Sequence, residues 1–211
     1  MTTAPTLDAI IEASNVIPVL AVKRLEDAAP LARALAAGGL KVVELTLRTA
    51  VALDAMKTMQ DAAPELMVGM GTVRTPEQAR ASAEAGAAFL VSPGLTPDLG
   101  DAMLATGLAC LPGVATAGEA MAAQAQGFKV LKFFPAEPAG GIAYLKALEG
   151  PLPDIRFCPT GSISRERAPD YLALPNVVCV GGSWIATSAD IDAANWLAIS
   201  DNARAAEAMK R

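Results

Sequence analysis

The chain has 211 residues, of which 53% are hydrophobic and 18% charged, a balance that excludes an intrinsically disordered chain. The length favours one domain over two, so we predict a single domain spanning residues 1–211. A net charge of −5 without a basic stripe argues against nucleic-acid partners, and the absence of histidine removes the commonest general base and metal ligand.

Residues 1–5 have neither the basic nor the apolar part of a signal peptide, and the longest uncharged stretch, residues 102–118, contains Gly107, Pro112 and Gly113. That stretch is shorter than the roughly 18–20 residues that a membrane helix needs. We therefore expect a cytoplasmic protein without a membrane partner. The three cysteines lie far apart in apolar runs and are expected to be free core thiols.

Short apolar runs alternate with longer amphipathic stretches along the whole chain. The predicted strands are residues 16–21, 41–47, 66–71, 88–92, 108–113, 129–134, 155–160 and 177–181. Predicted helices include residues 7–15, 25–38, 75–86, 96–107, 116–127, 164–173 and 189–211. Glu119 stands three residues after Thr116, which predicts a capping box, and Pro169 predicts a short or kinked helix.

Repeated strand–helix units predict an α/β fold with parallel strands, because each connection between strands is helical. Eight such units predict a single (βα)8 barrel of the TIM type, with an extra N-terminal helix before the first strand and a C-terminal helical cover. The alternative is a doubly wound open sheet. That fold usually carries a glycine-rich turn after its first strand, and residues 16–25 contain no glycine.

The second predicted strand carries polar residues on one side only. Glu44, Thr46 and Arg48 alternate with apolar residues, so they are predicted to face the barrel interior. Inward charges are costly unless they are paired or used. The alternative to a catalytic role is a structural ion pair between Glu44 and Arg48.

Lys132 lies in the middle of the apolar sixth strand. Burial disfavours a charged ammonium, and a neutral amine is the form that attacks a carbonyl carbon. We therefore predict a nucleophilic amine here. The alternatives are a lysine that extends to solvent and a lysine that forms an ion pair with Glu44.

The remaining strands end in small or polar residues. Thr72 offers a hydroxyl at the end of the third strand, and the last two strands end in Thr160-Gly161-Ser162 and Gly181-Gly182-Ser183. Glycine turns after the seventh and eighth strands of such barrels commonly bind phosphate through backbone N–H groups. Ordinary tight turns are the alternative. Together the residues suit imine chemistry on an anionic keto sugar, without a cofactor or a metal.

Six segments together resemble the 2-keto-3-deoxy-6-phosphogluconate (KDPG) and 4-hydroxy-2-oxoglutarate aldolase family. They are VELTLRT at residues 43–49, VGMGTV at 68–73, SPG at 92–94, LKFFPAE at 131–137, RFCPTG at 156–161 and GGSW at 181–184. The resemblance covers residues 16–184. It implies a class I aldolase, an aldehyde-lyase of the Entner–Doudoroff pathway, that acts on a phosphorylated 2-keto acid, releases pyruvate and forms a homotrimer.

The resemblance also implies a role for each matching residue. Lys132 matches the imine-forming lysine and Glu44 the proton-transferring carboxylate. The other matches bind or enclose substrate: Arg48 and Thr72 at its carboxylate, Pro93 and Phe134 as pocket walls, and Thr160, Gly161, Ser162, Gly181, Gly182 and Ser183 around the rest of the substrate and its phosphate.

Ser162 departs from the family, which usually has a second glycine at this place. The backbone N–H is kept, so phosphate binding is still expected, although the substrate preference follows less directly. Relatives that cleave the galactose-derived phosphate or 4-hydroxy-2-oxoglutarate share the imine chemistry and remain alternatives. A metal-dependent pyruvate aldolase and a non-catalytic barrel that binds a phosphorylated ligand are further alternatives.

Overall fold

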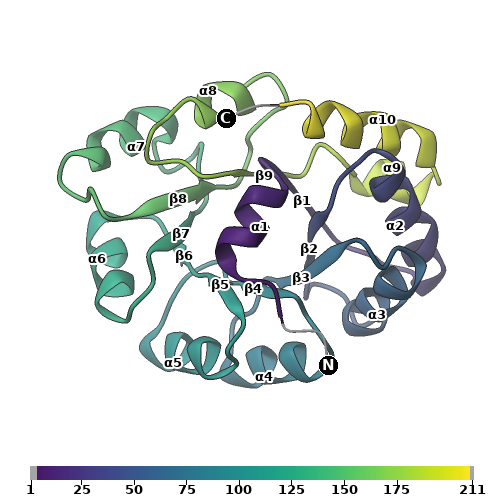
Figure 1. Cartoon of the computed structure of the whole chain (residues 1–211), viewed down its shortest axis with the longest axis horizontal. Helices are drawn as coiled ribbons and strands as arrows, with labels where there is room; N and C mark the ends of the chain where they lie inside the picture. The colour runs from purple at the N-terminus through teal and green to yellow at the C-terminus, as the bar shows by residue number, and fades with distance from the viewer. Residues whose placement is uncertain (1–3, 210–211) are drawn as a thin grey trace.

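The computed structural model describes residues 4–209 and contains short strands that pair only in parallel. The strands are β1 (Val16–Leu20), β2 (Val42–Thr46), β3 (Met67–Gly71), β4 (Phe89–Val91), β5 (Ala109–Leu111), β6 (Gly113–Val114), β7 (Val130–Phe133), β8 (Arg156–Pro159) and β9 (Val180–Gly182). They form a six-stranded sheet, β5-β4-β3-β2-β1-β9, and a three-stranded sheet, β6-β7-β8. The two sheets curl around a common interior, with most helices outside them (Figure 1).

The predicted fifth strand is divided in two. Pro112 separates β5, which pairs with β4, from β6, which pairs with β7. Proline has no N–H to donate, but its carbonyl still accepts a hydrogen bond from the Lys132 amide at 2.9 Å. Residues 109–114 therefore pair first with β4 and then with β7.

The predicted eighth strand begins later than expected. Only Val180–Gly182 form β9, while Val177 makes an isolated parallel bridge to Phe157. A second bridge joins Thr160 to Gly181. These bridges connect the β8 region to the β9 region, so the three-stranded and six-stranded sheets meet on this side as well.

Most helices lie between successive strands, while one precedes β1 and two follow β9. They are α1 (Leu7–Ala13), α2 (Ala28–Ala37), α3 (Ala52–Ala62), α4 (Pro76–Glu84), α5 (Pro97–Ala105), α6 (Ala117–Ala125), α7 (Gly141–Glu149), α8 (Ala168–Leu172), α9 (Ser188–Asp192) and α10 (Trp196–Glu207). The capping box of Thr116 and Glu119 is confirmed. Within the described residues, no helix has the length and apolar character needed to cross a bilayer.

The largest differences from the predicted helix bounds occur in three stretches. The stretch predicted at residues 25–38 begins as a 3-10 turn, Leu25–Asp27, before α2. Helix α8 starts only at Ala168, because Pro169 is tolerated in the first helical turn but not in a helix interior. The predicted tail, residues 189–211, is two helices separated by residues 193–195, and Lys210 and Arg211 lie outside the described residues.

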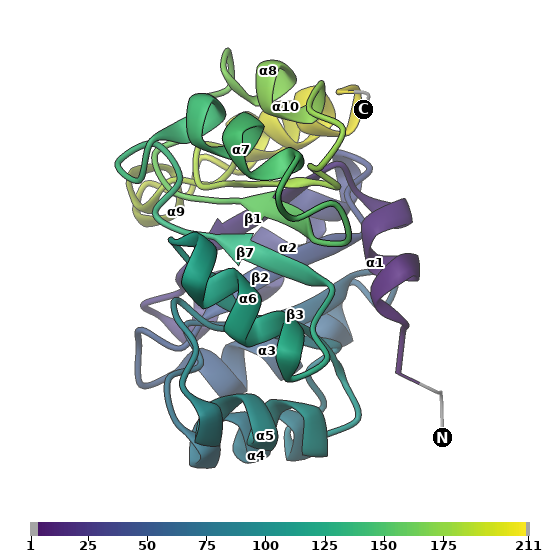
Figure 2. The same cartoon turned by 90° about the vertical axis from the view of Figure 1, so that its left-hand side faces the viewer.

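Helix α1 covers one end of the interior (Figures 1 and 2). Buried Ile10 of α1 belongs to an inner apolar cluster whose members include the first or second residue of several strands: Ile17, Val42, Phe89 and Val130. A second and larger core fills the space between the strands and the outer helices. With the amino ends of the strands filled, the interior is left open for a site at their carboxyl ends.

All three cysteines are buried and none forms a disulfide. Burial raises the pKa of the Cys110 thiol to about 12, so the unreactive protonated form dominates at neutral pH. We expect iodoacetamide at pH 8 to leave Cys110 unmodified in the native protein and to alkylate it in urea. Peptide mass mapping checks this, and rapid native labelling of Cys110 would contradict it.

Candidate active site

Lys132 and Glu44 meet inside the fold, although 88 positions separate them in the chain. Lys132 Nζ on β7 donates to Glu44 Oε1 on β2 at 3.1 Å and to Oε2 at 3.4 Å. Both residues are only 4% exposed. The predicted inward face of the second strand is confirmed, because its alternate residues Val43 and Leu45 pack in the outer core.

The structure decides between the pairings considered for these charges. Glu44 forms its ion pair with Lys132, and within residues 4–209 no ion pair joins Glu44 to Arg48. The ammonium of Lys132 also lies 5.2 Å from the centre of the Phe134 ring, which favours a cation over its face. The amine therefore has a carboxylate partner within proton-transfer distance and does not stand alone in an apolar strand.

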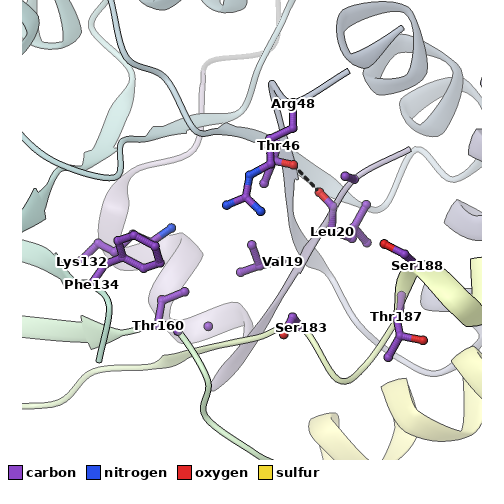
Figure 3. Close-up of a pocket in the computed structure, with 14 residues that line it drawn as sticks. Val19, Leu20, Thr46, Arg48, Lys132, Phe134, Thr160, Ser183, Thr187 and Ser188 are labelled. Atoms are coloured by element: carbon purple, nitrogen blue, oxygen red, sulfur yellow. Dashed lines mark hydrogen bonds between the residues drawn. The ribbon is translucent and has the colours of Figure 1, made fainter. Parts of the chain in front are cut away.

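A cavity of about 370 Å³ lies at the carboxyl ends of the strands (Figure 3). The side chains of Arg48, Lys132, Phe134 and Thr160 reach it from three different strands or from the residues that follow them (Figure 3). Its walls consist of Val19, Leu20, Ala21, Thr46, Arg48, Lys132, Phe134, Thr160, Gly161, Gly181, Ser183, Ala186, Thr187 and Ser188. The cavity thus offers two basic side chains to an anionic ligand in a protein of net charge −5.

The wall residue Arg48 contacts Thr72, which directly follows β3. Arg48 Nε donates to Thr72 Oγ1 at 3.2 Å. Thr72 has φ +59°, the left-handed conformation that a β-branched residue rarely adopts. The strained backbone at the end of β3 therefore holds a hydroxyl where it orients the guanidinium.

We expect Thr72→Gly to separate stability from binding. Relief of roughly 1–2 kcal/mol of left-handed strain offsets the ~0.5–1 kcal/mol of chain entropy that glycine adds. The free energy of unfolding should therefore stay unchanged or increase. Loss of a hydrogen bond to a charged group should raise KM for a keto acid about tenfold. Thr72→Ser, which keeps the hydroxyl, should keep KM. Urea unfolding and steady-state kinetics check both, and an unchanged KM in Thr72→Gly would contradict the role of the hydroxyl.

The far side of the cavity is formed by the ends of β8 and β9. Thr160, Gly161, Gly181 and Ser183, which were predicted to surround the substrate and its phosphate, all line it. A Cβ on Gly181 would overlap the Thr160 side chain, lying 2.7 Å from its Cγ2. The two strand ends can approach closely only because Gly181 has no side chain.

Five predicted residues do not line the cavity wall. Glu44 and Thr72 contact it through the wall residues Lys132 and Arg48, and the other three lie elsewhere. The Pro93 backbone packs against Gly113, Ser162 is exposed, and Gly182 faces Trp184 and Val16. Ser162 has φ +60°, so it keeps the backbone conformation for which glycine is the usual residue. The pocket and phosphate roles of these residues stay predictions.

Several wall residues were not among the predicted site residues. Thr46 was predicted from alternation to share the inward face with Glu44 but was assigned no role in the site; its Oγ1 donates to the Leu20 carbonyl at 3.0 Å. Val19 and Leu20 of β1 carry no chemical signal in the sequence. Thr187 and Ser188 show only a helix-start signal, since Thr187 caps α9.

The loop after β7 is anchored to α8. Tyr171 donates its hydroxyl hydrogen bond to Glu137 Oε1 at 2.8 Å, and Arg167 Nε lies 3.6 Å from the same oxygen. Burial, and then the hydrogen bond to Glu137, raise the pKa of Tyr171 above its usual range. Because this loop follows Lys132 and Phe134, the anchor fixes one wall of the cavity.

A parallel α/β fold that encloses a buried amine and carboxylate at one cavity defines a class of α/β enzymes that act on small molecules. Within that class, the chain belongs to the KDPG and KHG aldolase family, whose model matches residues 7–202. KHG denotes 4-hydroxy-2-oxoglutarate.

Individual relatives match nearly the whole chain. The 2-dehydro-3-deoxy-phosphogluconate aldolase of Pseudomonas aeruginosa is 45% identical over 97% of this chain and 92% of its own. A crystal structure of KDPG aldolase from Legionella pneumophila, with pyruvate captured as a covalent carbinolamine, is 46% identical, with a TM-score of 0.92 over 95% of this chain and 97% of that one. The KDPG aldolase of Zymomonas mobilis with 3-phosphoglycerate is 44% identical, with a TM-score of 0.90 over 97% and 96%.

Proposed function

We propose that this chain is a class I aldolase that reversibly cleaves KDPG to pyruvate and glyceraldehyde 3-phosphate through an imine on Lys132. The observation that carries the proposal is the buried contact of 3.1 Å between Lys132 Nζ and Glu44 Oε1 at the cavity. An amine and a carboxylate within one hydrogen bond of each other suit a nucleophile and its proton acceptor. The carbinolamine captured in the Legionella relative supports the same chemistry.

The reaction begins with proton transfer within the pair. A proton passes from the Lys132 ammonium to Glu44, and the lone pair freed on Nζ attacks the C2 ketone of the substrate. The carbinolamine oxygen then leaves as water, with a proton supplied by Glu44, and an imine remains. Arg48 binds the substrate carboxylate and so places C2 near Nζ.

The protonated imine then accepts the electrons of the bond that breaks. Glu44, directly or through a water molecule, removes the proton of the C4 hydroxyl. The O–H electrons form the aldehyde carbonyl, and the C3–C4 electrons move to C3 to give an enamine. Glyceraldehyde 3-phosphate departs, C3 is reprotonated, and hydrolysis of the imine releases pyruvate and restores Lys132.

We infer that the cavity recognises the substrate through its carboxylate at one end and its phosphate at the other. We further infer that Arg48 and Lys132 act on the pyruvate end and that Gly161, Gly181 and Ser183, which line the same cavity, offer uncharged donors to the phosphate. The Zymomonas relative that holds 3-phosphoglycerate supports a phosphorylated ligand. The galactose-derived phosphate and 4-hydroxy-2-oxoglutarate are alternative substrates of lower rank, because the Pseudomonas and Legionella relatives are named for KDPG.

Borohydride trapping tests the proposal. With pyruvate present, borohydride should reduce the imine and add the mass of a reduced pyruvyl group to one peptide, the one that contains Lys132. Pyruvate without borohydride, and borohydride without pyruvate, are the controls. Absence of any adduct, with folded protein, would reject the imine mechanism and favour a barrel that only binds ligand. Loss of turnover on chelation would instead favour a metal-dependent aldolase.

The proposal includes a closed eight-stranded barrel in one domain over residues 1–211. Closure is supported by the chain passing from β5 through Pro112 to β6, and by the bridges Phe157–Val177 and Thr160–Gly181. The same proposal includes a cytoplasmic homotrimer, which the family resemblance implies. Sedimentation equilibrium at micromolar concentration tests the trimer.

A further inference from the structure

The Glu44 side chain does not lie opposite its register partner on β3; it is displaced along the sheet toward the carboxyl end of β3. In the parallel register of β2 and β3, Glu44 pairs with Gly69 and Thr46 pairs with Gly71. Yet the carboxylate of Glu44 does not lie over Gly69. A Cβ built on Gly71 would lie 2.5 Å from Glu44 Cγ and 2.7 Å from Cδ, and closer still to Oε1. The Glu44 side chain therefore lies across Gly71, one inward-facing position nearer the cavity.

Few contacts hold the carboxylate in this place. Within residues 4–209, its two hydrogen bonds both come from Lys132 Nζ. When Lys132 becomes an imine, the nitrogen keeps one hydrogen where the ammonium had three, so this support weakens during turnover. The packing of Glu44 against Gly71 does not depend on the state of Lys132 and persists through the cycle.

We propose that Gly71 is a positioning residue for the proton-transferring carboxylate: its missing side chain leaves the space in which Glu44 lies. This inference rests on the proposed function, since it assumes that Glu44 moves protons. A Cβ at this position overlaps Glu44 and pushes Oε1 away from Lys132 and from the substrate. A displacement near 1 Å in such a site costs on the order of 100-fold in rate.

The chain supplies a matched control on the same strand and the same face. A Cβ on Gly69 would also overlap a neighbour, but that neighbour is the ring of Phe89, which belongs to the inner apolar cluster. Gly69→Ala therefore reports the cost of losing a glycine from β3. Gly71→Ala measures the effect of losing a glycine from β3 and, in addition, the effect of displacing Glu44.

The experiment measures kcat, KM, the pH dependence of kcat, and the rate of borohydride trapping with pyruvate. For Gly71→Ala we expect kcat to fall about 100-fold, with KM changed less than threefold, slower trapping and an altered pH dependence. For Gly69→Ala we expect lower thermal stability and an unchanged pH dependence. Equal effects of the two substitutions on kcat and on the pH dependence would overturn the proposal.

A double variant protects the test against misfolding. In the Glu44→Ala background the side chain ends at Cβ and none of the three atoms that a Cβ on Gly71 would overlap remains, so Gly71→Ala should then cost less than threefold in trapping rate. This difference between backgrounds is a coupling that distant residues do not show. The same cost in both backgrounds would overturn the proposal. Failure of wild-type protein to trap pyruvate would instead reject the proposed function itself.

Discussion

Replacing Lys132 by alanine should abolish turnover and pyruvate trapping together. No other lysine lines the cavity among the described residues, so no second amine can form the imine. Loss of a covalent nucleophile costs on the order of 10⁵-fold or more in kcat. Progress curves at high enzyme concentration and intact-mass analysis after borohydride measure both losses.

The control variant for this prediction must keep a positive charge opposite Glu44. Lys132→Ala leaves Glu44 buried without its ion pair, which costs about 3–5 kcal/mol of stability. Lys132→Arg keeps a positive charge opposite Glu44, but its guanidinium is a poor nucleophile. It should fold better than Lys132→Ala and still neither turn over nor trap pyruvate. If Lys132→Arg formed as much borohydride adduct with pyruvate as the wild type, the imine would form on a residue other than Lys132.

Replacing Glu44 by glutamine should separate imine formation from bond cleavage. The amide keeps nearly the same shape and still accepts a hydrogen bond from Lys132, but it cannot take up the proton of the C4 hydroxyl. General base catalysis contributes roughly 10²–10⁴-fold, so kcat should fall by that factor while KM changes little. Stopped-flow or coupled assays with KDPG measure kcat and KM.

Pyruvate trapping provides a second measurement on the Glu44→Gln variant, to be compared with its turnover. Pyruvate trapping requires the lysine but no cleavage of a C–C bond, so Glu44→Gln should still give the borohydride adduct, at a lower rate. A variant that keeps more than a tenth of wild-type kcat would exclude Glu44 as the base. Complete loss of both trapping and secondary structure would instead show that the Lys132–Glu44 pair is needed for folding.

The strands and most helices could be predicted because their signals are local. Alternation along β2 placed Glu44 inside, the capping box fixed the start of α6, and Pro169 shortened α8. The errors arose where pairing decides the element. A single fifth strand was expected, but its two halves pair with different neighbours on either side of Pro112. The eighth was expected from residue 177, but β9 starts at Val180 and Val177 makes an isolated bridge to Phe157.

Sequence by itself determined which charged residues face the interior, since period-two alternation alone identifies an inward lysine or glutamate in an apolar strand. Only the tertiary structure decided how they combine: that Lys132 pairs with Glu44 and not Arg48 with Glu44, that Thr72 holds Arg48, and that Gly71 makes room for the carboxylate. Each of these contacts joins residues on different strands. Their distances depend on strand order and register, which hydrophobic periodicity does not encode.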